Sequence, residues 1–436
     1  MQVENIPLLA AITKRAKDAA RTVKQGVFVP MTNVETETLT DLLDLPHIEV
    51  TKYGIERDSK QDIVHLYGRI MLEVAICSCC NELTSTIKEH KARCVRDCDV
   101  WGKRTFLHVD IRRFECDACG HRFTEELQAV GWRRRQTKRF EQQVYQACLE
   151  TSKNQVAKKF YLNDSTVRGI FKRWAKQQHQ GKRFGLVRVL GIDEISLKKR
   201  HKQFAVVISD LERHCVLAVL PDRKMETLKQ WVANLSDAQR AAIRTVSMDM
   251  WGPYRHFCKQ ALPKARRVAD RFHVMQQLNK RLGNARLAYQ RAADPETQAA
   301  LKGCRWLFVS VRDNLTPKQE RKLMQALDAA PELKQIYLLK EEFRLIFERI
   351  HDQRQAQRFL QAWICKVLFN GHKQLLAFVK TLLNWWSEIL NYFDKRVTSG
   401  FVEGINRAIR GLIWRAYGFR NFDNFRLQVL AEHGFS

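Results

Sequence analysis

The chain has 436 residues, 45% of them hydrophobic, and ten tryptophans, which allow several folded domains and exclude a disordered basic tail. Lysine and arginine outnumber aspartate and glutamate by 75 to 47, so the formal net charge is +28 and an anionic polymer is the favoured partner. We find no apolar run of membrane-span length and no signal-peptide core, so we expect a cytoplasmic protein without a membrane partner. The twelve cysteines are then thiols or metal ligands.

Residues 1–38 form an N-terminal extension whose first part has a basic, weakly amphipathic helical pattern. A short basic arm and an ordinary solvated helix both fit this pattern. Short alternating runs of β-forming residues follow, and they predict a small β-rich module over residues 39–127.

Two C-x-x-C knuckles lie inside this module, Cys77–Cys80 and Cys116–Cys119. Each knuckle can present two thiolates, and two knuckles complete the tetrahedral site that Zn²⁺ prefers. Four protein ligands leave no open position, so a structural role is expected. The gap between the knuckles is long, and the neighbouring residues that remain alternative ligands are Cys79, His90, Cys94, Cys98 and His121.

Residues 128–180 are basic and helical, and they predict a helix-turn-helix domain. The turn contains Asn163 and Asp164, and Ser165 is expected to cap the second helix. The expected core is Val156, Ala157, Phe160, Val167, Ile170 and Phe171. The residues expected to contact DNA are Arg133, Arg134, Arg135, Ser165, Thr166, Arg168, Lys172 and Arg173. An ordinary basic helical hairpin is the alternative.

Alternating strand and helix patterns predict an α/β sheet over residues 181–282. The expected strands are 187–192, 204–208, 215–220, 244–248 and 266–269. Asp193, Asp249 and Asp270 are expected to end the first, fourth and fifth of them. This order is similar to the ribonuclease-H-like fold, in which the first and fourth strands lie side by side. Asp193 and Asp249 would then meet, and paired carboxylates suit Mg²⁺ or Mn²⁺. Alone, such an aspartate is more often a turn cap.

Residues 283–395 show only helical patterns, and their aromatic residues are expected to form the core of an all-α insertion. Residues 396–436 contain a last helix in which Glu403, Asn406, Arg407 and Arg410 fall on one face. Periodicity alone interprets Glu403 and Arg407 as a surface ion pair.

Five motifs together resemble the ISL3-type DDE transposases of bacterial insertion sequences. They are the paired knuckles, the helix-turn-helix, Gly191–Glu194, the segments Met248–Tyr254 and Ala269–Val274, and Ser399–Asn406. The extension before Leu39 has no counterpart in the family pattern.

The resemblance implies a multidomain α/β protein: a zinc-binding β-rich module, a helix-turn-helix domain, and a ribonuclease-H-like catalytic core with a large all-α insertion. It implies an acidic triad of Asp193, Asp249 and Glu403 that holds two Mg²⁺ or Mn²⁺ ions. The implied activity is cleavage at the terminal inverted repeats and strand transfer into target DNA. A homo-oligomer, at least a dimer on nucleoid DNA, is expected. Further expected DNA contacts are Lys198, Lys199, Arg200, Arg407 and Arg410.

Two alternatives remain. The chain could be a non-enzymatic DNA-binding regulator built on the zinc module and helix-turn-helix, or a structure-selective nuclease that cuts without joining. The presence of all three acids in their motifs disfavours a decayed catalytic domain.

Overall fold

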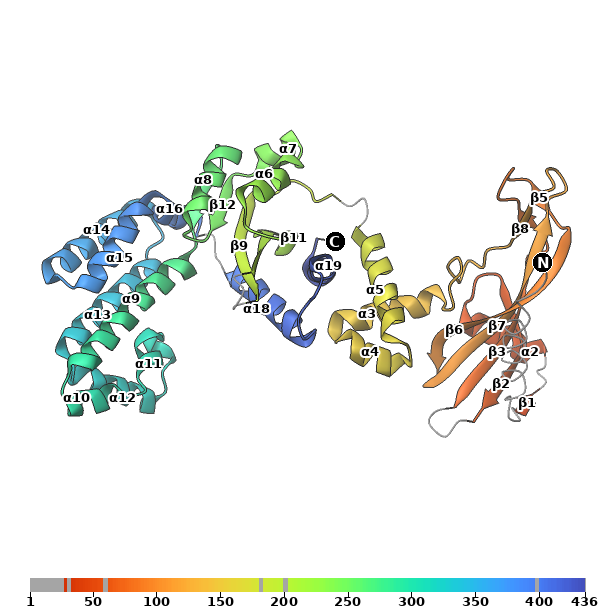
Figure 1. Ribbon diagram of the computed structural model, residues 1–436, viewed down its shortest axis with the longest axis horizontal. Coiled ribbons are helices and arrows are strands. Elements are labelled where there is room, and N and C mark those ends of the chain that lie inside the picture. Colours follow the sequence, from red (N-terminus) through yellow and green to blue (C-terminus); the bar gives the residue numbers. More distant parts are fainter. Residues whose placement is uncertain are drawn as a thin grey trace, which may run out of the picture. The chain divides into compact units, whose positions relative to one another are not determined.

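The computed structural model describes residues 27–29, 33–57, 62–179, 183–198, 203–396 and 400–435. The chain forms two compact units, one ending at Trp174 and one beginning at Ala175, and each is described by itself (Figure 1). Most of the predicted extension 1–38 lies outside the described residues, as do Lys199 and Arg200. Within the described ranges, no helix combines the length and the apolar character that crossing a bilayer requires.

The first unit is built on a sheet in the order β1-β2-β3-β7-β6. Its strands are β1 (Val27–Val29), β2 (Ile48–Glu56), β3 (Ile63–Ile70), β6 (Ile87–Val100) and β7 (Lys103–Glu115), with β8 (Arg122–Thr124) paired to β7. Side chains alternate between the two faces, and one face buries Val64, Leu66, Leu107 and Val109. Helix α2 (Asn33–Leu43) contributes to the same core through Leu43. The predicted β-rich module is therefore present.

Three helices complete the first unit: α3 (Lys138–Glu150), α4 (Lys153–Phe160) and α5 (Asp164–His179), of which the last continues into the second unit. All six residues predicted to form the helix-turn-helix core are buried. Tyr161 ends α4 in a left-handed conformation (φ 54°), which makes the turn before α5. The predicted cap is wrong by two residues. Helix α5 already begins at Asp164, because the Asn163 carbonyl accepts from the N–H groups of Thr166 and Val167.

The second unit contains a five-stranded sheet in the order β11-β10-β9-β12-β13. The strands are β9 (Val189–Lys198), β10 (Gln203–Asp210), β11 (Cys215–Leu220), β12 (Thr245–Met248) and β13 (Arg266–Ala269). The first three pair antiparallel, whereas β12 pairs parallel with both β9 and β13. The predicted contact between the first and fourth strands is confirmed.

Strand β9 extends further than predicted, and Asp193 lies within it rather than at its end. The reason is that β10 continues to pair with β9 beyond this point, with Val207 opposite Asp193. On the other side of β9, β12 ends at Met248, opposite Ile192. Asp193 is therefore the first β9 residue beyond the end of β12. It still lies at the edge of the part of the sheet where β9, β12 and β13 run parallel.

Different helices cover the two faces of this sheet (Figure 1). Leu190, Ile192 and Val206 face helices α6 (Met225–Ala233) and α8 (Gly252–Ala261). Ile195 and Val207 face helices α18 (Gly400–Arg415) and α19 (Phe422–His433). Because side chains alternate along a strand, Asp193 lies on the same face as Ile195, toward α18. A short helix, α7 (Asp237–Ala242), was not predicted.

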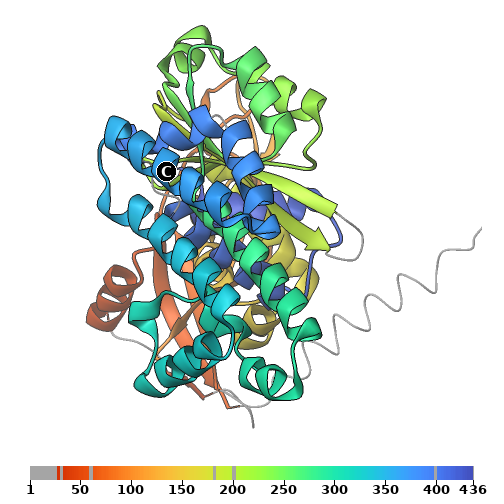
Figure 2. The ribbon, with the colours of Figure 1, turned by 90° about the vertical axis from the view of Figure 1, so that its left-hand side faces the viewer.

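The predicted helical insertion is present, although its first helix starts earlier than expected. Its helices are α9 (Arg271–Ala292), α10 (Pro295–Leu301), α11 (Arg305–Val309), α12 (Pro317–Asp328), α13 (Pro331–Arg349), α14 (Gln353–Asn370), α15 (Lys373–Asn384), α16 (Trp386–Leu390) and α17 (Tyr392–Lys395). The long helices α9, α13, α14 and α15 lie side by side (Figure 2). Residue 283 falls inside α9, which runs without a break from the sheet into the insertion. Trp363 is fully buried against Phe343 and Phe378, as a core aromatic should be, whereas Trp306 is 69% exposed.

Candidate active site and zinc centre

The two aspartates of the central sheet lie on either side of one histidine. Asp249 directly follows β12, and Asp193 lies one position past its end on β9. His273, in the first turn of α9, has Nδ1 3.1 Å from Asp249 Oδ1 and Nε2 3.8 Å from Asp193 Oδ1. The imidazole therefore occupies the space between the two carboxylates.

Helix α18 reaches the same site through Asn406. Its Nδ2 donates to Asp193 Oδ2 at 2.6 Å, and both side chains are buried. The backbone N–H of Glu194 donates to Asp193 Oδ1 at 2.6 Å. Both oxygens of Asp193 thus have a donor, which fixes the orientation of the carboxylate.

Burial raises the pKa of Asp193 to about 6, even though His273 and the Glu194 N–H favour its charged form; the nearby carboxylates of Asp270 and Asp249 raise it further. A buried carboxylate beside other acids is stabilised by a cation. Asp193 and Asp249 offer hard oxygen donors, which are the ligands of Mg²⁺ and Mn²⁺. The donor set fits such an ion.

Glu403 lies in the first turn of α18, three residues before Asn406. Its side chain is 48% exposed, and Arg407 Nη2 lies 3.3 Å from Glu403 Oε1. Among the described residues, the carboxylate oxygens of Glu403, Asp193 and Asp249 are not close enough together to form one three-acid metal site. The structure thus brings Asp193 and Asp249 together, with Glu403 one helical turn from the residue that bonds to Asp193.

Asp270 has a structural use of its own. It is the N-cap of α9, and its Oδ1 accepts from the N–H of Phe272 at 2.8 Å. This bond satisfies one of the unpaired donors at the helix start. His273 Nε2 lies 4.0 Å from Asp270 Oδ2, so Asp270 borders the site.

Three residues of this site had no assigned role in the sequence: His273, Asn406 and Tyr254. His273 follows Asp270 by three residues at the start of α9, and Asn406 follows Glu403 by three residues in α18. This spacing places each of them on roughly the same side of its helix as the acid. Tyr254 is fully buried in α8 next to the acids, and burial raises the pKa of its hydroxyl. Its position inside the Met248–Tyr254 motif was the available signal.

The four cysteines of the two knuckles come together in the first unit. The Sγ atoms of these residues all lie within 4.8 Å of one another; the residues are Cys77, Cys80, Cys116 and Cys119. The Cys77–Cys119 and Cys80–Cys116 sulfur distances are 3.7 and 3.5 Å. Burial raises the pKa of the Cys77 thiol, but donation from the backbone N–H groups of Cys80 and Cys79 outweighs it and lowers that pKa to about 6. Such a four-cysteine set supports Zn²⁺.

The two knuckles have the same backbone turn. The residue after each second cysteine, Asn81 (φ 63°) or Gly120 (φ 67°), is left-handed, and its N–H donates to the carbonyl of the first cysteine. Asparagine and glycine tolerate this conformation, which explains their presence there. Within the described part of the chain, none of the alternative ligands joins the cluster.

Most of the residues predicted to contact DNA are exposed, but Arg173 is engaged inside the first unit. Ser165, Arg168 and Lys172 are exposed along one side of α5. Arg173 instead binds Glu141 of α3, which also accepts from Trp174 Nε1 at 3.1 Å. Because that pair ties α5 to α3, Arg173 does not face outward as predicted.

The other predicted contacts are distributed over both units. Thr166 and Arg134 are half-buried, whereas Arg133, Arg135, Arg407 and Arg410 are exposed. Lys198 ends β9, and Lys199 and Arg200 lie outside the described residues.

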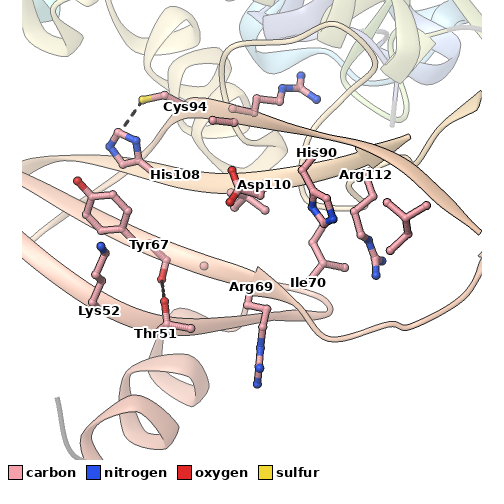
Figure 3. Close-up of a pocket in the computed structure, with 15 residues that line it drawn as sticks. Thr51, Lys52, Tyr67, Arg69, Ile70, His90, Cys94, His108, Asp110 and Arg112 are labelled. Atoms are coloured by element: carbon pink, nitrogen blue, oxygen red, sulfur yellow. Dashed lines mark hydrogen bonds between the residues drawn. The ribbon is translucent and has the colours of Figure 1, made fainter. Parts of the chain in front are cut away.

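A cavity of about 790 Å³ lies on the sheet of the first unit, lined by Lys52, Tyr67, Arg69, His90, Cys94, His108, Asp110 and Arg112 among others (Figure 3). The ring of Tyr67 stacks on His108 at a centroid distance of 4.7 Å, and Lys52 lies over Tyr67. Asp110 is the only acid in this lining. The cavity lacks the paired carboxylates that metal-dependent phosphodiester chemistry requires, so it is not the candidate active site.

The raised pKa of Asp193 predicts a pH-dependent effect of Asp193→Asn in metal-free protein. The folded state binds the extra proton between about pH 4 and pH 6, so charging Asp193 lowers stability as pH rises through this window. Asp193→Asn should raise the unfolding temperature in EDTA at pH 7.5, and this gain should disappear below about pH 4. The highly exposed Asp237 supplies the control, since Asp237→Asn should show no such gain. A gain from Asp193→Asn that does not change with pH would contradict the account.

The zinc centre predicts about one zinc per chain in purified protein. Cys116→Ser or Cys119→Ser should release the metal and open the knuckle region to proteolysis. Cys79→Ser is the matched control, because Cys79 lies in the first knuckle but outside the cluster. Folded wild-type protein without zinc, or loss of zinc from the control variant, would remove the assignment.

Three family models match consecutive parts of the chain. Residues 73–119 match the zinc-finger of transposase IS204/IS1001/IS1096/IS1165, and residues 120–175 match the helix-turn-helix domain of transposase family ISL3. Residues 190–429, more than half of the chain, match the ISL3-type DDE model, which is described as transposase.

Two curated relatives extend this similarity. The transposase for insertion sequence element IS1001 of Bordetella parapertussis is 28% identical over 388 residues, which cover 87% of this chain and 95% of the relative. The transposase for insertion sequence element IS1557 of Mycobacterium tuberculosis (strain H37Rv) is 27% identical over 350 residues, or 74% of this chain and 77% of the relative. With its catalytic segment, helix-turn-helix and zinc finger all matched in order, the chain belongs to the ISL3 family of DDE transposases.

Proposed function

We propose that this transposase binds the terminal inverted repeats of its insertion sequence and catalyses metal-dependent DNA strand cleavage and strand transfer into target DNA. The observation that carries the proposal is the position of Asp193 and Asp249 next to each other where β12 ends beside β9, with α18 packed beside them. The strand order β11-β10-β9-β12-β13 supports a ribonuclease-H-like core.

The proposed catalytic acids are Asp193, Asp249 and Glu403. The carboxylates of Asp193 and Asp249 would hold Mg²⁺ or Mn²⁺, and Glu403 would complete the set from α18. When bound, two such ions supply an activated hydroxyl nucleophile and neutralise charge on the phosphodiester. Asn406 is a positioning residue, since it fixes Asp193 by a hydrogen bond. His273, which faces both aspartates, would keep the two carboxylates apart before substrate arrives.

Recognition of the element's ends is proposed for the first unit. The exposed side of α5, with Ser165, Arg168 and Lys172, has the form of a recognition helix that enters the major groove. Arg168 Nε also binds Asp164 within the helix, so Lys172 is the freer cation of the two. Arg133 and Arg135 are exposed before α3, and in this proposal they contact phosphates.

Two element ends must be held together before both are joined to a target. We therefore expect a homo-oligomer, at least a dimer on DNA, acting in the cytoplasm on nucleoid DNA. Binding of zinc by the knuckles would keep the first unit folded while it engages the repeats.

Glu403 gives the sharpest test of the catalytic assignment. Glu403→Gln keeps the size and helix propensity of the side chain, and it removes only an exposed ion pair, so folding and end binding should survive. Cleavage of labelled element ends and joining to a supercoiled target should both fall by several orders of magnitude, as with Asp249→Asn.

Asp270→Asn is the control, because asparagine also caps helices and α9 should keep its start. If Asp270→Asn abolished cleavage while Glu403→Gln left it intact, the third acid would be Asp270. Cleavage without joining by the wild-type protein would instead indicate a nuclease.

A further inference from the structure

The outer side of α18 carries an unbroken stripe that starts at the proposed third acid. Glu403, Arg407, Arg410 and Trp414 are all exposed and follow one another at intervals of four, three and four residues. At 3.6 residues per turn, these positions fall within about 60° of one another around the helix. The opposite side, with Ile405, Ile409 and Leu412, is buried against the sheet and α19. We call these four exposed residues the α18 stripe.

One large aromatic residue ends the stripe, and a second follows it just beyond the helix. Trp414 is 83% exposed, and Tyr417, just after the helix, is 98% exposed. Tyr417 has φ 53°, a left-handed backbone that bulky residues rarely adopt. The turn is held by N–H donation from Tyr417 to the Trp414 carbonyl and from Gly418 to the Ile413 carbonyl. A fixed turn therefore presents both rings outward.

Two glycines flank the stripe without serving internal packing. Apart from its chain neighbours and the backbone of its own helix, a Cβ added at Gly404 or Gly411 would meet no described atom within 4 Å. Glycine inside a helix is less favourable than alanine, so its presence needs another reason. Close approach of an external backbone is such a reason, because the helix surface is flat there.

The charges on the stripe indicate what approaches. Within the described part of the chain, the acidic partner of Arg407 is Glu403, four residues away at the helix surface, and such a pair is weak. Arg410 has no acidic partner among the described residues. Cations followed by exposed rings are the composition of a surface that follows a nucleic-acid strand: phosphates contact the cations, and bases stack on the rings.

We propose that the α18 stripe guides the DNA strand that is cut, and that Trp414, with Tyr417 beside it, stacks on an unpaired base of that strand. This inference rests on the proposed function. Arg407 and Arg410 contact the intervening phosphates. Base faces are available to such rings only when the base leaves the duplex stack. Eleven residues of helix separate Trp414 from Glu403, or about 16 Å, which matches roughly five nucleotides of one strand. The extruded base therefore lies about five nucleotides from the scissile bond.

The test combines protein variants with DNA from which one base has been removed. Full-length zinc-loaded protein is titrated without divalent cation into duplexes that carry an end of the element, each with one abasic site at a different position. On intact DNA, Trp414→Ala should weaken binding roughly ten- to a hundredfold. On DNA that is abasic about five nucleotides from the cleavage position, wild type and variant should bind alike, because no base remains to stack. At other positions the full loss should persist.

Two variants serve as controls. Trp306→Ala removes another exposed tryptophan, from α11, and should leave affinity unchanged on every duplex. Arg410→Gln should weaken binding on all duplexes alike and reduce the salt slope by about one, as loss of a phosphate contact does. Trp414 is too exposed to be needed for folding, and an unchanged unfolding temperature checks this.

The outcomes separate the two proposals. If wild-type protein does not bind element ends, the proposed function fails. If it binds them but the loss caused by Trp414→Ala is the same at every abasic position, the base-stacking role is overturned. A change in oligomeric state of Trp414→Ala without DNA, measured by light scattering, would also overturn it and assign the two rings to contact with a second copy.

Discussion

The structure of the second unit depends on the unequal lengths of two neighbouring strands. Strand β12 stops at Met248, opposite Ile192, while β9 continues because β10 still pairs with it. Asp193 and Asp249 therefore emerge side by side at a step in the sheet. Two acids in this position, one of them buried, disfavour the charged state unless a cation is near. In this structure the imidazole of His273 lies between the two carboxylates.

Helix α18 joins this step to the protein surface. Its inner side anchors it by apolar contacts with Ile195 and Val207, and Asn406 adds one buried hydrogen bond to Asp193. The helix can then hold Glu403 near the site, while the rest of its outer side, from Arg407 to Trp414, remains exposed. One element thus serves packing, positioning and, in our proposals, catalysis and strand guidance. The apolar contacts fix the orientation of the helix, so the exposed stripe is a consequence of the same periodicity.

Local patterns predicted most strands, the knuckles and the helix-turn-helix core, because these depend on alternation, turn residues and short spacing. Contacts between distant segments were not predictable in this way. Arg173 was expected to face DNA, but it pairs with Glu141, 32 positions away. Strand β9 continues past Asp193 because β10 pairs with it there, and the pattern of apolar residues does not predict which strands pair. The insertion boundary was missed because α9 serves both the sheet and the insertion. Only the family resemblance gives Glu403 a catalytic role, and that role stays a prediction; periodicity interprets it as a surface acid paired with Arg407, and this pair is present.

In our proposal, Asp193, Asp249 and Glu403 hold the same divalent ions. Iron-dependent backbone cleavage tests it directly, because Fe²⁺ bound in place of Mg²⁺ cuts the chain near its ligands. We expect three cuts, near residues 193, 249 and 403, all suppressed by excess Mg²⁺. Cuts near residues 193, 249 and 270, with none near residue 403, would contradict it.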